Sequence, residues 1–424
     1  MTRKAKCNKG MVFLLSVVMV LLLGATAFAD QQAAPLAGEA VTVVTPEEFK
    51  AAMEAGGAVE LAGNIVIDTE MDIHIATPVT LDLKGFTVTK TYGARNHYFM
   101  VIQTGGSLTL TDSASGGALI ASDSSYGYGI QLEGSAPSFI MEGGRIKTTQ
   151  ESIDISDFAS DVKVEIYDGM ILSSDDSVLC VRGSNTDIDI TGGTLQSGGR
   201  TGVYISGSPD TPVQFDMTGG KLTQTSGRSG AIQAYKGAEL TIGGSAEIEG
   251  QGTYAVQAQN TVKLEITDGL LSSTGSTAVS LSGTAECIIS GGSVASITGA
   301  AIRAEDTAVV NVRNGSIASE RGAAIRTEDN ASVNIAGGTL KGAESTGALQ
   351  EYGSDNNSTI TVTGGTFSSN VDTYIPSGLT IQNNGDGTFT VKRMDSPEGI
   401  YVSTLLLKVP PVTVIVELLS DPYS

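Results

Sequence analysis

The sequence predicts an all-β fold, a right-handed parallel β-helix in which each coil contains three short strands. A pair of apolar residues, two positions apart, recurs at intervals of roughly 25 residues, and a Gly-Gly, Asp-Gly or Asn-Gly turn closely follows each pair. A nearly fixed period of this length is typical of a solenoid. The pairs are Phe139 and Met141, Val164 and Ile166, Ile188 and Ile190, Phe215 and Met217, Leu240 and Ile242, Leu264 and Ile266, Cys287 and Ile289, Val310 and Val312, Val333 and Ile335, and Ile360 and Val362.

The alternation inside one repeat indicates the three strands. In the repeat 262–283, Leu264 and Ile266 lie on the same face of a strand, because residues two apart on a strand face the same side. After a glycine turn Leu271 continues the inner wall, and Val279 with Leu281 forms a third inner strand. We expect about eleven to thirteen such coils over residues 41–392, a rod of roughly 50 to 60 Å at the usual strand spacing.

The N-terminal segment 1–29 has the features of a removable signal peptide. Four basic residues precede an apolar run from Met11 to Leu23, and the small-residue pattern that follows predicts cleavage after Ala29. The apolar run is shorter than the roughly 20 residues that a membrane span needs. We therefore expect a secreted or cell-surface protein with no membrane span in the mature chain, and a linker over residues 30–40.

The chain is acidic, with a formal net charge of −21 at pH 7. Removal of the leader would take away four basic residues and no acidic residue, which leaves −25. This charge argues against nucleic acid or an anionic membrane as a partner. We expect an exported monomer.

The start of the mature chain predicts a short helix over residues 45–55. Thr45 and Glu48 make a capping box, Pro46 suits the first helical position, and Phe49 with Met53 lies on an apolar stripe. The segment 45–67 is similar to the capping helix and first coil of the pectin-lyase-like β-helix superfamily. The phrases at 108–122 and 364–391 resemble repetitive secreted and cell-surface β-helix proteins of Gram-positive gut-type bacteria. This resemblance implies the fold but no single activity.

The C-terminal residues 393–424 break the repeat pattern. Their apolar runs are interrupted by Lys408 and by Pro410-Pro411, so we predict an irregular tail rather than a membrane segment.

Two cysteines remain after removal of the leader, and they predict no disulfide. Cys180 and Cys287 lie about four coils apart, which is beyond disulfide reach. We expect Cys287 to fill a core position and Cys180 to point outward from its strand.

Two short motifs resemble catalytic residues of the polygalacturonases in the same superfamily, namely Asp175-Asp176 and Arg145-Ile146-Lys147. In that family the Arg-x-Lys follows the paired aspartates and a Gly-His-Gly motif. Here it precedes the pair, and no histidine occurs after His97. We therefore interpret Asp175 and Asp176 as solvated turn residues and predict no catalytic residues.

A stronger candidate site comes from the near-duplicate segments 300–308 and 323–331, which are one coil apart. The register predicts that Arg303 stacks on Arg326, at roughly 5 Å. The predicted metal ligands are the carboxylates that stack in the same way, Glu305 on Glu328 and Asp306 on Asp329. Three interpretations stay open: a Ca²⁺ or uronate site, a lyase site with an arginine base, which the resemblance implies, or an Arg/carboxylate ladder of structural value. We expect no required cofactor, and Ca²⁺ is the one candidate.

The outward positions of the third strand form the most continuous polar row of the sequence. Its members are Gln131, Tyr204, Gln233, Gln257, Ser280, Arg303, Arg326 and Gln350. Such a row suits an extended polysaccharide, although side-chain amide stacking explains it equally well. We take Arg303, Arg326, Gln233, Gln257 and Tyr204 as the predicted ligand-binding residues. The predicted function is a non-enzymatic, adhesin-like or glycan-contacting β-helix, and the alternative is a lyase or hydrolase of acidic, pectin-like polysaccharide.

Overall fold

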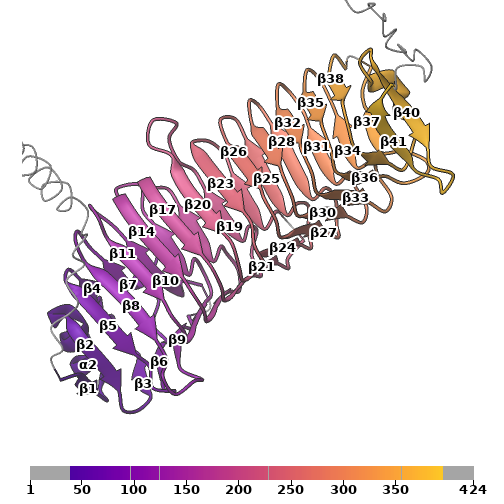
Figure 1. Cartoon of the computed structure of the whole chain (residues 1–424). Helices are drawn as coiled ribbons and strands as arrows, with labels where there is room; N and C mark the ends of the chain where they lie inside the picture. The colour runs from indigo at the N-terminus through magenta and orange to yellow at the C-terminus, as the bar shows by residue number, and fades with distance from the viewer. Residues whose placement is uncertain (1–38, 96, 124, 228, 355, 395–424) are drawn as a thin grey trace, which may run out of the picture.

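A computed structural model describes residues 39–394 except 96, 124, 228 and 355. The chain forms a parallel β-solenoid of about 13 coils, drawn out into a rod (Figure 1). Three long sheets, which we name A, B and C, run along the rod, and each regular coil contributes one strand to each sheet. The predicted architecture of three strands per coil is confirmed.

The sheets contain 14, 15 and 12 strands respectively. The strands of sheet A are β1 (Val41–Val43), β2 (Gly57–Leu61), β5 (Pro78–Asp82), β8 (Ser107–Thr111), β11 (Ser138–Met141), β14 (Ser160–Ile166), β17 (Ser184–Ile190), β20 (Val213–Met217), β23 (Ala238–Ile242), β26 (Lys263–Ile266), β29 (Glu286–Ile289), β32 (Val309–Val312), β35 (Ser332–Ile335) and β38 (Thr359–Val362). The strands of sheet B are β3 (Ile65–Ile67), β6 (Thr87–Lys90), β9 (Ala118–Ala121), β12 (Arg145–Thr148), β15 (Met170–Ser173), β18 (Thr194–Ser197), β21 (Lys221–Gln224), β24 (Glu247–Gly250), β27 (Leu270–Ser273), β30 (Ser293–Ser296), β33 (Ser316–Ser319), β36 (Thr339–Lys341), β39 (Thr366–Phe367), β41 (Phe389–Arg393) and β40 (Leu379–Asn383). The strands of sheet C are β4 (His74–Ile75), β7 (Tyr98–Ile102), β10 (Tyr128–Leu132), β13 (Ile153–Ile155), β16 (Leu179–Val181), β19 (Val203–Ile205), β22 (Ile232–Ala234), β25 (Val256–Gln259), β28 (Val279–Ser282), β31 (Ile302–Ala304), β34 (Ile325–Thr327) and β37 (Leu349–Glu351).

The paired apolar residues of the sequence form the inner wall of sheet A. All ten pairs are buried, and the most exposed member, Ile360, has only 8% of its surface accessible. Successive pairs lie in register, so that Leu264 pairs with Leu240 on one side and Cys287 on the other. The period of the sequence therefore reports the length of one coil.

Glycine forms the tight corners where coils touch. A Cβ atom added to Gly275 would lie 1.7 Å from the carbonyl oxygen of Gly252 in the preceding coil, which is closer than any side chain allows. At the Asn314-Gly315 turn, Gly315 has a φ of 101°, a conformation that glycine adopts without steric cost.

The N-terminal end of the rod is covered by helix α2 (Pro46–Ala55). Thr45 and Glu48 form both hydrogen bonds of the predicted capping box, and Phe49, Ala52 and Met53 are buried. The helix contacts the first strand of each sheet and covers apolar surface that the first coil would otherwise expose to water.

The C-terminal end has a different cover. The last strands of sheet B, β41 and β40, pair in the antiparallel direction after β39, with the 3₁₀ helix η1 (Asp372–Tyr374) between β39 and β40. Solenoid coils therefore give way to a hairpin within the predicted range 41–392. The predicted signal peptide, most of the linker and the tail beyond Met394 lie outside the described residues. Among the described residues, the structure contains no helix that is both long and apolar enough to cross a membrane.

The register makes a test possible at two adjacent positions of β23. Replacing the buried Ile242 by lysine should unfold the central coils, because a lone buried charge costs several kcal/mol against a total stability of about 5–15 kcal/mol. The same lysine at Thr241 should be tolerated, because that position lies between Asp216 and Glu265 on the outer face. Circular dichroism melting of the two variants provides the comparison, and equal melting temperatures would contradict the register.

Candidate functional site

The outer face of sheet C carries the predicted polar row. Strand pairing places its members in register from β7 to β37 as Val101, Gln131, Asp154, Cys180, Tyr204, Gln233, Gln257, Ser280, Arg303, Arg326 and Gln350. Asp154 was not among the predicted members of this row, although the alternation of Ile153, Asp154 and Ile155 could have identified it. Cys180 belongs to the row as expected of an outward residue, but neighbouring side chains leave it only 5% exposed, and burial raises the pKa of its thiol.

Three of the predicted ligand-binding residues lie together near the middle of the row. The Thr201 hydroxyl donates to Gln233 Oε1 at 2.6 Å, and Gln233 Nε2 donates to Gln257 Oε1 at 2.7 Å. The ring of Tyr204 lies 5.5 Å from that of Tyr235, with an angle of 51° between the planes. The amides form the stacked ladder that was one of the two interpretations of the polar row, and the tyrosines add an aromatic surface beside it.

The two predicted arginines lie on the same row, three and four coils after Gln233. Arg303 is in register with Arg326, as predicted. Glu328 bridges the two guanidinium groups, at 2.8 Å from Arg303 Nε and 2.9 Å from an Arg326 terminal nitrogen. Glu305 pairs with Arg303 at 2.5 Å, and Arg326 lies over the ring of Tyr352, 3.5 Å from its centroid.

The two aspartates predicted as metal ligands accept hydrogen bonds from backbone amides at a corner of the coil. Asp306 and Asp329 have φ values of 58° and 57°. The Gly283 amide donates to Asp306 Oδ2 at 2.8 Å, and the Asp306 amide donates to Asp329 Oδ2 at 3.4 Å. Within the described residues, no group of three or more His, Cys, Asp or Glu side chains is arranged to hold a metal ion. The carboxylates predicted as metal ligands are thus engaged by arginines or by backbone amides.

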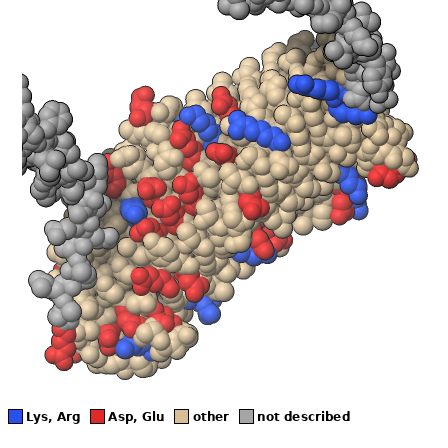
Figure 2. All heavy atoms as spheres, in the orientation of Figure 1, with Lys and Arg blue, Asp and Glu red and all other residues tan. Residues whose placement is uncertain are grey.

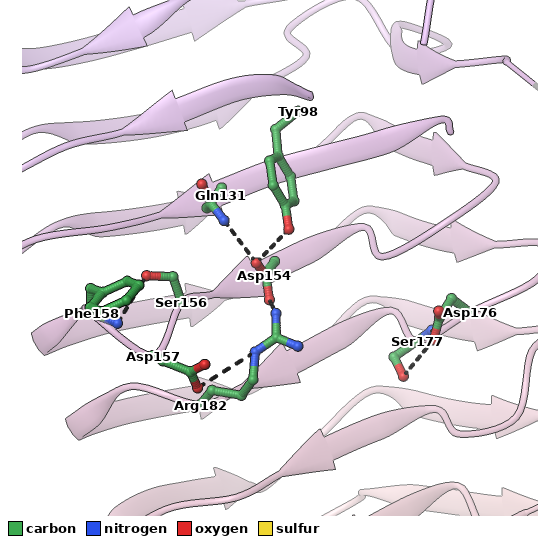
Figure 3. Close-up of polar contacts among 9 residues, drawn as sticks. All are labelled: Tyr98, Gln131, Asp154, Ser156, Asp157, Phe158, Asp176, Ser177 and Arg182. Carbon is green, nitrogen blue, oxygen red and sulfur yellow. Dashed lines mark hydrogen bonds and ion pairs between the residues drawn. The ribbon is translucent and has the colours of Figure 1, made fainter. Parts of the chain in front are cut away.

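Asp154 is the most completely buried acidic side chain on the outer face of sheet C (Figure 3). The Tyr98 hydroxyl donates to its Oδ2 at 2.7 Å, and Gln131 Nε2 donates to the same oxygen at 3.0 Å. Arg182 forms an ion pair with Asp154 Oδ1 and lies 3.9 Å from Asp157. Burial, and then the charge of Asp154, raises the pKa of Tyr98, so the phenol remains a hydrogen-bond donor. Four coils are joined by this network.

A hollow of about 370 Å³ opens beside the network, at the corner where the chain enters sheet C. Its charged lining residues are Glu151, Asp176, Arg182 and Arg200, and its aromatic lining residues are Tyr204 and Tyr235. Predicted residues Tyr204 and Gln233 therefore line a concave site, whereas Arg303 and Arg326 do not contribute to it.

Glu151 is the electrostatically unusual residue of this hollow. Its Oε2 atom is buried and has no hydrogen-bond partner in the part of the chain that the structure describes. Burial raises the pKa of Glu151, and the charge of Asp176 raises it further. A titratable group with these two perturbations in a concave site is a functional candidate.

The sequence interpretation of Asp176 as a solvated turn residue was incomplete. Asp176 lies at a coil corner, as predicted, but it lines the hollow together with Glu151. Glu151 was missed because it lies in the segment 149–152 between two strands, where strand alternation says nothing about side-chain direction. Of the two histidines in the sequence, His74 is exposed and His97 lies 3.4 Å from Asp72.

Two other surface features are chemically simpler. A hollow of about 530 Å³ over sheet B is lined mainly by Ser, Ala and Gly, and Glu320, Lys341 and Glu344 also line it. Such a lining offers few groups that could orient a ligand. On sheet A, Glu165, Asp189 and Asp216 lie in register. Figure 2 shows acidic side chains gathered over the N-terminal half of the rod.

Comparison of the chain with protein-family models, with curated proteins and with solved structures found no match in any of the three.

The Arg303/Arg326 ladder gives a test of stability against pH. Burial opposes ionisation of Glu328, but hydrogen bonds and charge from the two arginines outweigh it, so the pKa of Glu328 lies below its ordinary value. A carboxylate of this kind stabilises the fold above the unfolded pKa and loses that contribution as the pH falls through the folded pKa. Glu328→Gln should lower the free energy of unfolding by ~1 kcal/mol at neutral pH, and urea denaturation should show the difference shrinking in acid. The matched variant Glu320→Gln, at an exposed site, should change little, and an equal loss in both variants would refute this role.

Proposed function

We propose that the protein is a non-enzymatic glycan-binding β-helix that contacts an extended polysaccharide along the outer face of sheet C. The observation that carries this proposal is the hollow beside β16, β19 and β22, lined by two tyrosines and by charged and amide side chains. Sugar rings present both hydroxyl groups and apolar C–H faces, and a site with hydrogen-bonding groups next to aromatic rings matches both.

The surroundings of the hollow favour a polymer rather than a single sugar. The polar row continues on both sides of the hollow, through Gln131 in one direction and through Gln257 and Ser280 in the other. Successive members are one strand spacing apart, about 4.8 Å. An extended chain that lies along the rod would therefore meet a new side chain of the row at each coil.

We also infer that the chain belongs to the pectin-lyase-like superfamily and is exported as an adhesin-like surface protein. Support for the first inference comes from the three-strand coil and the capping helix α2. Support for the second comes from the leader-like sequence of residues 1–29 and the net charge of −21. An acidic, elongated protein of this kind suits the cell exterior better than contact with nucleic acid.

The binding proposal is tested by a glycan array followed by calorimetry with the best ligand. Tyr204→Ala and Tyr235→Ala should each weaken binding by about tenfold, since central aromatic residues dominate such sites. The control is Tyr167→Ala, because Tyr167 is 48% exposed beyond β14, at the end of a sheet A strand. A ligand that binds the parent and both hollow variants equally would place the site elsewhere.

The alternative function is a polysaccharide lyase or glycoside hydrolase, and the neighbouring Glu151 and Asp176 are the observation that favours it. Hydrolysis of a glycosidic bond needs one protonated and one ionised carboxyl group on either side of the bond. We expect neither reducing ends nor unsaturated uronides to be released from pectic polymers, with or without Ca²⁺. Turnover that disappears in Glu151→Gln or Arg303→Ala would replace the binding proposal by the enzymatic one.

A further inference from the structure

Two carboxyl groups in the hollow lack a neutralising partner. Glu151 lies just before β13 and Asp176 just before β16, so they come from consecutive coils. Asp176 Oδ1 accepts a hydrogen bond from the Ser177 amide at 2.8 Å, whereas Glu151 Oε2 is buried and accepts none from the described residues. Neither carboxyl group forms an ion pair with any side chain that the structure describes.

The arginines near the hollow offset the charge of the two carboxyl groups only in part, because the charge of Arg182 lowers the pKa of Glu151 by less than burial and Asp176 raise it. Arg182 is already paired with the fully buried Asp154, and its Nε lies near Asp157. Arg200 is exposed, and its charge is therefore largely screened by water. A buried carboxyl group next to a second one, with open space in front of both, is a place where a positive charge would be stabilised.

The aromatic lining points to the same chemistry. Tyr204 and Tyr235 line the hollow, and the faces of aromatic rings attract cations. The same surface already holds one such contact, where Arg326 lies over Tyr352. A cation in the hollow would therefore meet two carboxylates and two aromatic rings.

The size of the hollow favours an organic cation over a bare metal ion. Its volume of about 370 Å³ is far more than a bare ion fills. The described residues also provide no group of three or more ligands for a metal. Beside the carboxylates, the hydrogen-bonded series of Thr201, Gln233 and Gln257 presents hydroxyl and amide groups that match sugar hydroxyls.

We propose that this hollow binds a protonated primary amine carried on a sugar ring, so that the preferred glycan contains amino sugars without their N-acetyl groups. This inference rests on the glycan-binding function proposed above. The ammonium group would lie between Glu151 and Asp176, and the ring would pack against Tyr204 and Tyr235.

The affinity of the hollow for a protonated amine should depend on pH. The titratable or charged groups around Glu151 are Tyr98, Tyr128, Asp154, Asp176, Cys180, Arg182 and Arg200. Burial and then the charge of Asp176 raise the pKa of Glu151, so this carboxyl group loses its proton at a higher pH than an ordinary glutamate does. Affinity should therefore rise as the pH increases through this raised pKa, and fall again once the amine of the ligand loses its proton.

The test compares two matched ligands, the β-1,4-linked hexamers of glucosamine and of N-acetylglucosamine, by calorimetry on the purified protein. We expect the glucosamine hexamer to bind at least about tenfold more tightly. Glu151→Gln and Asp176→Asn should each remove this preference while binding of the N-acetylated hexamer is retained. Glu265→Gln, which removes one exposed charge from sheet A, should keep the preference.

Each other outcome has a clear meaning. Equal affinity for the two hexamers would overturn the amine site and leave glycan binding standing, whereas no binding of any glycan would remove both proposals. A preference that persists in the Glu151→Gln, Asp176→Asn double variant, or equal binding of polylysine, would show general attraction to an acidic protein. Release of reducing ends would show hydrolysis instead of binding.

Glu151→Gln should also raise the melting temperature at neutral pH, because a carboxyl group with a raised pKa destabilises the fold above its unfolded pKa.

Discussion

The in-register stacking of successive coils is the constraint on which the rest of this structure depends. Each strand pairs residue by residue with the equivalent strand of the next coil, so every side chain has fixed neighbours on both sides. Inward positions must exclude water along the whole rod, and the pairs of sheet A are accordingly apolar and buried. Outward positions and corners have no such requirement, and the chemistry of the protein is therefore confined to the outer rows and to the corners between strands.

The coil lengths explain which parts of the site could be predicted from the sequence. From β28 to β34 the coils are equal in length, with paired positions at 280, 303 and 326, so simple counting places Arg303 on Arg326. From β7 to β22 the coils are unequal, with paired positions at 101, 131, 154, 180, 204 and 233. Contacts across these unequal coils, such as that between Tyr98 and Asp154, depend on how each corner folds. The alternation of inward and outward residues predicts the direction of side chains within strands but not at corners. Glu151 and Asp176 both lie at corners.

Stacking also repeats like charges at a spacing where they repel, and the chain compensates for this in different ways. Glu328 is shared by two arginines, and Asp306 and Asp329 accept hydrogen bonds from backbone amides of the preceding coil. Asp154 is saturated by Tyr98, Gln131 and Arg182. Each of these carboxylates has a structural explanation within the described residues.

Glu151 differs from these carboxylates because its Oε2 atom is buried without a hydrogen-bond partner among the described residues, and its burial is compensated only in part. A half-buried carboxyl group with an unpaired oxygen costs free energy, and replacement by a neutral residue at a surface corner would remove that cost. Residues that destabilise a fold in this way are concentrated at functional sites. On the outer face of sheet C and its corners, the distinction between fully and partly compensated carboxylates therefore separates the residues that hold the rod together from those that are suited to a ligand.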